Sequence, residues 1–253
     1  MDRVIIKSSG EPTYRLPDIA YHRDKFDRNF DVIVDVFGAD HMDAYPDVIA
    51  AIKSLDYDSD KIKVLIHQFV TVLKNGEPVK MSTRKANFIS LDSLIDEVGA
   101  DVTRFFFIMR SMNTHLNFDL DLAKEQSDAN PVFYIQYAHA RCCNMLRRFE
   151  GDLESIDESS LEHLKLDIET QLINKLLTFP EVIRKSSQTL EPQNISNYLA
   201  ELSSSFHSYY AKERVIDSEN KILTEARIYL VNATRIVIRN GLKILGVSAP
   251  EQM

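Results

Sequence analysis

The sequence lacks long hydrophobic runs, separated cysteines and an excess of positive charge, and each absence excludes a class of protein. No apolar run approaches the ~20 residues that a membrane-spanning helix needs. The first seven residues are too few and too polar for a signal peptide. Cys142 and Cys143 are adjacent, so they fit neither a zinc site nor a disulfide between distant segments. We therefore expect a reduced, cytoplasmic protein.

The formal net charge of −8 counts against non-specific binding to nucleic acid. Any RNA site must then be a local face that combines basic and aromatic side chains. The length of 253 residues suits one large domain or two ordinary ones. With 44% hydrophobic and 27% charged residues, the composition is that of an ordinary globular protein.

The first part of the chain predicts alternating strands and helices. The β-branched run 32–37 is typical of a buried parallel strand, and Asn75-Gly76 is the strongest short signal for a β-hairpin. This order predicts a parallel sheet wound on helices, with a ligand site at the carboxyl ends of the strands. The expected elements are strands at 4–6, 32–37 and 61–72 and helices at 18–26 and 47–55.

From residue 91 onward the pattern shows only helical periods, which predict an antiparallel bundle at the end of the chain. Gly246 is placed to cap the last helix. We place the domain boundary near residue 127, which gives an α/β domain over 1–126 and an all-α domain over 127–253. The expected helices cover 101–109, 129–149, 161–187, 196–215 and 219–245.

The stretch from Lys80 to Arg84 carries cations together with hydroxyl groups. Lys80, Arg84 and Lys85 lie within six residues, and Ser82 and Thr83 lie among them. A cationic loop beyond a hairpin suits a polyphosphate, whose negative charge develops on the leaving group. On the five residues from Lys80 to Arg84 alone, a solvated basic turn is the favoured interpretation.

Two shorter segments in the first domain also suit ligand binding. Tyr14 and Asp18 lie four residues apart around a helix start, where a phenol and a carboxylate can hold a guanidinium group. Asp18 could instead only complement the helix dipole. Gly38, Asp40 and His41 follow a predicted strand, where glycine permits close approach and Asp40 can accept from ribose hydroxyls. The alternative is an ordinary strand-to-helix turn with a capping aspartate.

One face of the predicted helix 129–149 carries Tyr134, Tyr137, Arg141 and Arg148. Tyrosines beside arginines are side chains on which single-stranded RNA stacks. The alternative is that these tyrosines pack against a neighbouring helix. The histidines are scattered without metal-ligand spacing, so we expect no side-chain metal site, and no Ser-His-Asp arrangement is visible.

Taken together, these segments resemble arginyl-tRNA synthetases over essentially the whole chain. The segment from Tyr14 to His22 looks like the family's arginine site, and Gly38-Ala39-Asp40-His41 like its adenosine turn. Lys80 to Arg84 resembles its mobile loop, and Asn130 to Arg141 is highly specific to its anticodon-binding helices. The family's His-Ile-Gly-His motif is absent, so the chain resembles the C-terminal half. Thr83 also stands where the common loop has a second lysine.

The resemblance implies the second half of a class I synthetase Rossmann-type catalytic domain, followed by an α-helical bundle that binds the anticodon. It implies ATP-dependent activation of arginine, with Mg²⁺, and transfer to an arginine-specific tRNA. This chain alone would be inactive because the other half of the active site is missing, and the missing N-terminal half becomes an expected partner. The implied contacts are Tyr14 and Asp18 for arginine, Gly38, Asp40 and His41 for ATP, Lys80, Ser82 and Arg84 for catalysis, and Tyr134, Tyr137, Arg141, Tyr210 and Met253 for tRNA.

Two other functions stay open at this point. One is a stand-alone RNA-binding module that descends from a synthetase and has lost its chemistry. The other is an interaction protein with no RNA role. Tyr14, Asp18 and the Lys80 loop favour descent from a working enzyme over both.

Overall fold

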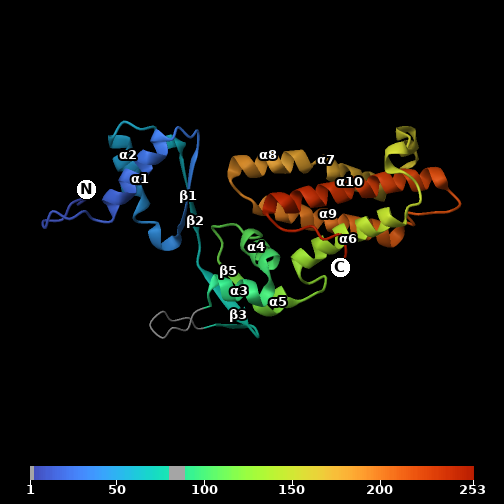
Figure 1. The fold of residues 1–253 in the computed structure, drawn as a ribbon, viewed down its shortest axis with the longest axis horizontal. Helices are drawn as coiled ribbons and strands as arrows, with labels where there is room; N and C mark the ends of the chain where they lie inside the picture. Colours follow the sequence, from blue (N-terminus) through green and yellow to red (C-terminus); the bar gives the residue numbers. More distant parts are fainter. Residues whose placement is uncertain (1–2, 80–88) are drawn as a thin grey trace. The chain divides into compact units, whose positions relative to one another are not determined.

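The computed structural model describes residues 3–79 and 89–253, which form two compact units (Figure 1). The N-terminal unit comprises Met1–Thr71 with Met112–Leu116, and the C-terminal unit comprises Val72–Ser111 with Asn117–Met253. Within the described ranges, no helix has the length and apolar character needed to cross a membrane. The boundary near residue 127, between the predicted α/β domain and the predicted all-α domain, stays a prediction.

The N-terminal unit is built on two parallel strands. β1 (Ile33–Gly38) pairs in parallel with β2 (Ile62–His67), in a register that joins Ile33 to Ile62 and Gly38 to His67. The helices α1 (Arg15–Asp27) and α2 (Tyr45–Ser54) lie on one side of these strands (Figure 1). Strand, helix and parallel strand therefore follow each other as the sequence predicts.

The core of the N-terminal unit lies between the helices and one face of the strands. Its buried residues are Ile19 and, from the strands and α2, Ile33, Val48, Ile52 and Ile62. Side chains alternate across a strand, and the residues between these positions on β1 are exposed: Val34 by 42% and Val36 by 60%. The run 32–37 is therefore a parallel strand as predicted, but only its alternate residues are buried.

The predicted strand at residues 4–6 is wrong. This segment makes one isolated antiparallel bridge, between Ile6 and Pro12, and Val4 is 63% exposed. Three β-branched residues favour an extended backbone, but a strand needs a partner, and the turn through Gly10 (φ +84°) offers only one bridging position.

The hairpin predicted at Asn75-Gly76 is confirmed. β3 (Val70–Lys74) pairs antiparallel with β4 (Glu77–Pro78), and Asn75 and Gly76 have φ of 54° and 75°. β3 also pairs with β5 (Leu116–Asp119), a strand that the sequence analysis missed. β5 has four residues, too few to establish an alternating pattern, and its partner β3 lies about forty residues earlier.

Three short helices accompany this small sheet: α3 (Leu91–Val98), α4 (Ala100–Ile108) and α5 (Leu120–Lys124). The α3 helix is capped by Ser90, whose side chain accepts from the backbone NH of Ser93. Phe105 and Phe106 of α4 are 1% exposed, and Phe106 packs against Phe118 of β5 with ring centroids 5.3 Å apart.

The rest of the C-terminal unit is a helical bundle, as predicted. The long helices α6 (Pro131–Arg148) and α9 (Gln193–Lys212) both pack against α10 (Lys221–Leu245), which runs the length of the bundle (Figure 1). α6 begins where the sequence dictates, because Asn130 caps its first turn and Pro131 follows at the first helical position. Gly246 (φ 69°) ends α10 in the left-handed conformation.

The single helix predicted over 161–187 is wrong, because two helices occupy this stretch. They are α7 (Asp167–Leu177) and α8 (Phe179–Thr189), and Thr178 separates them. Pro180 lies in the first turn of α8. Proline has no backbone NH and its ring collides with the preceding turn, so a helix can begin at Pro180 but cannot continue through it.

The bundle encloses its own apolar core. Leu199, Leu202, Phe206 and Tyr209 of α9 are all 0% exposed. The contact between α9 and α10 depends on a small residue, since a Cβ at Gly241 would lie 2.7 Å from Leu199 Cδ2. The two long helices thus approach each other more closely than a larger side chain would permit.

Candidate functional site

The turn at the carboxyl end of β1 lies where an open parallel sheet binds ligands. Because β1 and β2 are parallel, Gly38 and His67 end both strands at the same edge. Asp40 folds back over Gly38 so closely that a Cβ there would lie 2.5 Å from Asp40 Oδ1. His41 stacks on Phe37, with ring centroids 5.6 Å apart. The turn thus leaves no room for a larger side chain at Gly38 unless Asp40 moves, and it presents exposed polar side chains.

Tyr14 and Asp18 are both exposed at the start of α1. Tyr14 occupies the cap position without a capping hydrogen bond, and Asp18 lies in the first turn, where it also complements the helix dipole. No hydrogen bond or ion pair among the described residues joins either side chain to the Gly38–His41 turn. The three predicted loop residues Lys80, Ser82 and Arg84 lie outside the described residues.

The first turn of α1 is anchored to α2 by an ion-pair network that the sequence analysis did not detect. Arg15 Nε lies 2.8 Å from Asp47 Oδ2, and Arg3 Nε lies 3.2 Å from Asp47 Oδ1. Burial would raise the pKa of Asp47, but the hydrogen bond from Arg15 and the charge of Arg3 outweigh it and lower that pKa. The arginines therefore fix the segment that presents Tyr14 and Asp18.

On α6, the predicted aromatic and basic face meets α9. Tyr134 and Tyr137 both contact the ring of His207, with centroids 4.7 and 5.9 Å apart. The Arg141 guanidinium lies between two rings, 4.5 Å from the centroid of Tyr137 and 4.6 Å from that of Tyr210. It donates to the Tyr137 hydroxyl (2.7 Å) and to His207 Nδ1 (3.2 Å).

This cluster satisfies its own polar groups while keeping an open side. Burial lowers the pKa of His207, which keeps the ring neutral and able to accept from Arg141. Tyr134 and Tyr137 are only half-buried. The tyrosines thus pack against a neighbouring helix, which was the alternative interpretation, and still reach the surface. His207 could have been found from sequence, because it lies three residues before Tyr210 on one face of α9.

Four of the five predicted RNA contacts line one pocket. Tyr137, Arg141, Tyr210 and Met253 surround a volume of about 580 Å³ whose other walls include Asn144 and Arg147. We call this the C-terminal pocket. Tyr134 lies in the same cluster but does not line it. Tyr210 is 38% exposed whereas Tyr209 is fully buried, so only Tyr210 can meet a ligand here.

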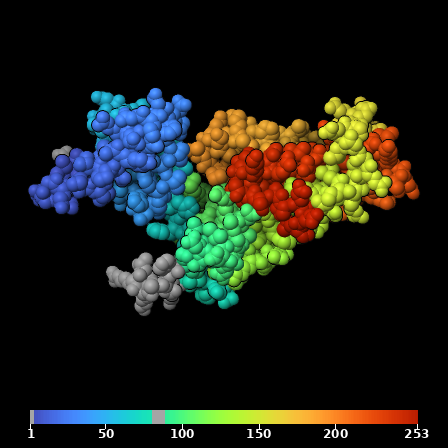
Figure 2. All heavy atoms as spheres, viewed as in Figure 1, coloured from blue at the N-terminus to red at the C-terminus, as the bar shows by residue number. Residues whose placement is uncertain are grey.

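Hydrogen bonds from α4 and α6 hold the last residues against the bundle. Asp101 accepts from the backbone NH of Ser248 (3.1 Å), and Gln136 donates to the Ser248 carbonyl (3.0 Å). His139 Nδ1 donates to the carbonyl of Pro250 (2.9 Å), and both terminal nitrogens of Arg147 donate to that of Glu251 (3.2 Å). In the space-filling view the red C-terminal residues lie next to the yellow-green surface of α6 (Figure 2). Met253 is thereby positioned at the pocket.

Within the described ranges, no three His, Cys, Asp or Glu side chains lie close enough together to bind a metal ion. Cys142 and Cys143 are free and buried, and burial raises the pKa of both thiols. These two cysteines therefore act as packing residues rather than nucleophiles.

Two family models match successive parts of the chain. Residues 1–138 match the family described as tRNA synthetases class I (R), catalytic domain, and residues 135–253 match the DALR anticodon binding domain. The chain is 52% identical to the arginine–tRNA ligase of Salinibacter ruber and 55% identical to that of Chlorobium phaeobacteroides. Both matches cover 100% of this chain but 45% and 46% of those proteins, so the chain spans about half the length of the relatives it matches.

Solved structures agree. A crystal structure described as an arginyl-tRNA synthetase from Campylobacter jejuni superposes with a TM-score of 0.90 at 32% identity, over 100% of this chain and 55% of that one. The arginyl-tRNA synthetase of Thermus thermophilus gives a TM-score of 0.83 at 21% identity, over 99% of this chain and 51% of that one, which shows the fold alone. The predicted fold class, part of a class I catalytic domain followed by a helical anticodon-binding domain, is confirmed. The chain belongs to the arginyl-tRNA synthetase family and corresponds to its C-terminal half.

Proposed function

We propose that this chain supplies the anticodon-binding part and one half of the active site of an arginine–tRNA ligase. The observation that carries the proposal is the C-terminal pocket, which gathers Tyr137, Arg141, Tyr210 and Met253 on the domain that matches an anticodon-binding family. Aromatic rings beside a guanidinium group are what unpaired RNA bases stack on. The substrates of the complete enzyme are arginine, ATP with Mg²⁺, and an arginine-specific tRNA.

In the proposed reaction, the carboxylate of arginine attacks the α-phosphate of ATP and expels pyrophosphate. The terminal ribose hydroxyl of the tRNA then attacks the carbonyl carbon of the adenylate and releases AMP, which gives arginyl-tRNA. The contribution of the protein is positioning and charge stabilisation rather than a nucleophile of its own. The Gly38 turn fits the adenosine part, because Gly38 has no side chain to block the approach, while Asp40 offers exposed acceptors and His41 a ring. Lys80, Ser82 and Arg84 would serve the phosphates.

This chain alone covers only one half of the site, so we propose that it forms no arginyl-adenylate without the remainder of the enzyme. A stand-alone RNA-binding module would use the same C-terminal pocket but would have no need of a binding site for arginine. The cytoplasm, where tRNA is charged, is the proposed location.

The RNA proposal is tested with the full chain and a labelled anticodon stem-loop of an arginine tRNA. Tyr137→Ala removes a ring that contacts both Arg141 and His207. Base stacking contributes ~1–3 kcal/mol per base, so the dissociation constant should rise by a factor of ~5 to ~150. Tyr21→Phe, which changes an exposed ring of the N-terminal unit, is the matched control. An unchanged affinity in a folded Tyr137→Ala variant would leave this tyrosine with a packing role only.

The arginine site is tested in the complete enzyme. Asp18→Asn keeps the size of the side chain but removes its charge, and a hydrogen bond to a charged group contributes ~1.5–3 kcal/mol. We expect kcat/KM for arginine to fall ~10- to ~150-fold, with the KM for ATP nearly unchanged. Pyrophosphate exchange against each substrate measures both. Equal losses for arginine and ATP would mean that Asp18 supports the fold instead of binding the guanidinium group.

A further inference from the structure

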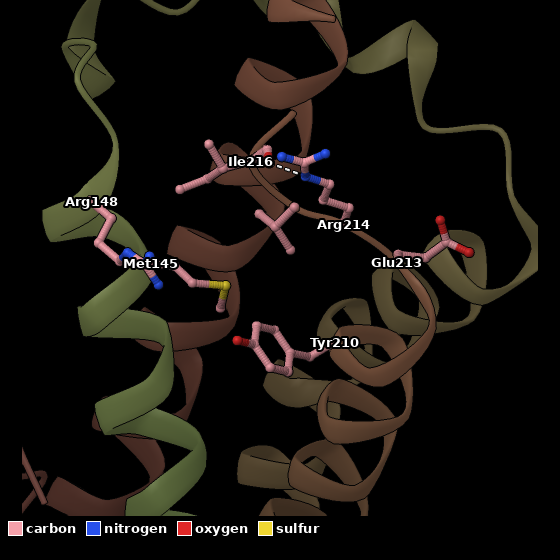
Figure 3. Close-up of a pocket in the computed structure, with 7 residues that line it drawn as sticks. Met145, Arg148, Tyr210, Glu213, Arg214 and Ile216 are labelled. Atoms are coloured by element: carbon pink, nitrogen blue, oxygen red, sulfur yellow. Dashed lines mark hydrogen bonds between the residues drawn. The ribbon is translucent and has the colours of Figure 1, made fainter. Parts of the chain in front are cut away.

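A second pocket adjoins the C-terminal pocket and shares Met145 and Tyr210 with it (Figure 3). Its volume is about 500 Å³. It lies between the end of α6 and the segment that follows α9, and its walls include Arg148, Arg214, Val215 and Ile216. We call it the α6–α9 pocket. Of its lining residues, the sequence pointed to Arg148, on the aromatic and basic face of α6, and to Tyr210 as parts of an RNA site.

The side chains of this pocket combine an apolar surface with two exposed cations and one carboxylate, that of Glu213, which pairs with Arg227. Figure 3 shows Tyr210 and Met145 next to the opening, with Arg148 on the α6 side and Arg214 on the opposite side. Arg148 and Arg214 are both exposed, and Val215 is buried. An aromatic ring and a thioether suit the face of a nucleobase, and guanidinium groups suit phosphate oxygens, which they bind through two parallel hydrogen bonds.

The wall that carries Arg214 is held in place by a buried arginine. Arg227 of α10 is 6% exposed, and its Nη1 donates to the carbonyl of Arg214 (2.8 Å). Its Nη2 lies 2.9 Å from Glu213 Oε2, and its Nε lies 2.8 Å from Glu169 Oε1. Arg214 Nε also donates to the carbonyl of Ile216 (3.1 Å; Figure 3). The backbone and the stem of Arg214 are therefore fixed before any ligand arrives, which reduces the entropy cost of binding.

Tyr210 connects the two pockets. In the C-terminal pocket one face of its ring is covered by the Arg141 guanidinium group. The ring also lines the α6–α9 pocket, together with Met145. A strand of RNA that places one nucleotide beside Arg141 can therefore continue past Tyr210 and place its neighbour between Arg148 and Arg214.

We propose that the α6–α9 pocket binds a second unpaired nucleotide of the same RNA loop, with its base against Tyr210 and Met145 and its phosphate between Arg148 and Arg214. This inference rests on the proposed anticodon binding and extends it to Met145 and Arg214, which no sequence motif marks, and gives Arg148 a specific role. The competing explanation for Arg148 is that a cation at the last position of α6 complements the helix dipole. That explanation predicts an effect on stability but none on RNA affinity.

The test uses the full chain, the labelled anticodon stem-loop and the variants Arg148→Ala and Arg214→Ala. Each should weaken binding by about 10-fold, as expected when a charge-assisted hydrogen bond to phosphate is removed. The slope of log K against log salt should decrease by about 0.7 for each phosphate of the single strand that the variant no longer neutralises. Arg184→Ala is the charge-matched control, because Arg184 is exposed on α8, pairs with Glu181 and lines neither pocket.

A second set of RNAs locates the contact. In each stem-loop one loop phosphate is replaced by an uncharged methylphosphonate. At one linkage, replacing the phosphate should weaken binding by the wild-type chain but not by Arg214→Ala. That variant has already lost the contact between the arginine and this phosphate. Circular dichroism confirms that each variant is folded.

The outcomes separate this inference from the proposed function. If Tyr137→Ala weakens binding while Arg148→Ala and Arg214→Ala bind with unchanged affinity and salt slope, the α6–α9 pocket binds no nucleotide and anticodon binding stands. If the arginine variants weaken binding equally for every methylphosphonate RNA and Arg184→Ala does the same, the effect is general charge and the inference fails. If the wild-type chain binds no stem-loop, both proposals fail together.

Discussion

The two units of this chain differ in how completely each encloses its apolar residues. In the helical bundle, the large side chains of α9 such as Phe206 and Tyr209 are fully buried. In the N-terminal unit, the helices cover one face of β1 and β2, and the opposite face exposes Val34, Val36 and, just beyond β2, Phe69 by 42%, 60% and 61%. The helical bundle is closed around its apolar core, whereas the N-terminal unit presents an apolar sheet face to solvent.

That difference has an energetic consequence. Burial of apolar area contributes roughly 25 cal/mol per Å², and a parallel sheet normally has both faces covered. The bundle therefore has the larger favourable contribution within this chain, and the N-terminal unit has the smaller.

The bundle should resist hydrogen exchange far better than the N-terminal unit. We expect backbone amides of α6, α9 and α10 to exchange at least about 30-fold more slowly than those of α1 and β1, because local opening costs more where more apolar area is buried. Hydrogen–deuterium exchange of the full chain, resolved by peptide mass spectrometry, measures this directly. Equal protection in the two units would show that the exposed face of β1 costs little stability.

Removing the buried arginine of the bundle should destabilise it strongly. Arg227→Ala leaves the Glu169 carboxylate, 0% exposed, without its partner, and an uncompensated buried charge costs about 3–5 kcal/mol. Chemical denaturation followed by circular dichroism gives the free energy of unfolding. Arg184→Ala, which breaks the exposed pair with Glu181, should cost less than about 1 kcal/mol.

The double variant Arg227→Met with Glu169→Gln sharpens this comparison. It removes both charges at similar volume, so we expect it to recover part of the stability that Arg227→Ala loses. Glu169 also accepts from the backbone NH of Leu166 at the start of α7 (3.0 Å), and glutamine keeps an oxygen for that bond. No recovery in the double variant would mean that packing around Arg227, rather than its charge, holds the bundle together.

The smallest expected effects are those of pH, and they fall in different windows for the two units. Burial lowers the pKa of His139 from its usual 6.5, and the positive charges of Arg235 and Arg239 lower it further. The hydrogen bond to the carbonyl of Pro250 opposes this shift without reversing it. The unfolded state then binds the proton more tightly, so the bundle should lose stability as the pH falls below about 6.5. His139→Asn keeps a donor for Pro250 and should flatten this dependence.

In the N-terminal unit, the pH effect comes from Asp35 and acts at lower pH. Burial alone would raise the pKa of Asp35, but hydrogen bonds from Lys25 and His22 outweigh it and bring the pKa below its usual 3.8. Its stabilisation is therefore complete above about pH 3.8 and is lost as the pH falls through the lower, folded-state pKa. Exchange rates of β1 that already rise between pH 6.5 and 5 would contradict this assignment.

Much of the fold could be predicted because its signals are local. The hairpin at Asn75-Gly76, the start of α6 at Asn130-Pro131 and the end of α10 at Gly246 each depend on backbone preferences of one or two residues. The errors have two kinds of cause: one is a local signal that was overlooked, and the other is packing between distant segments. Pro180 marks the break between α7 and α8 in the sequence itself, whereas β5 exists only because β3 lies beside it.

The candidate site divides in the same way. Its residue types and the shared face of Tyr134, Tyr137 and Arg141 follow from the sequence, because helical periodicity alone places them together. The proximity of Tyr210 and Met253 does not follow from the sequence, because more than forty residues separate them. The contacts of Tyr134 and Tyr137 with His207 likewise depend on the packing of α6 against α9.

The sequence by itself determined the family, the division into an α/β part followed by a helical part, and the chemical types of the candidate contacts, because these depend on short-range patterns. Only the tertiary structure decided that Tyr210 rather than Tyr209 reaches the surface, that Arg141 lies between two rings, and that Arg227 fixes the wall beside Arg214. The physical reason is that burial and side-chain pairing across helices depend on packing between segments distant in the chain, which no local pattern encodes.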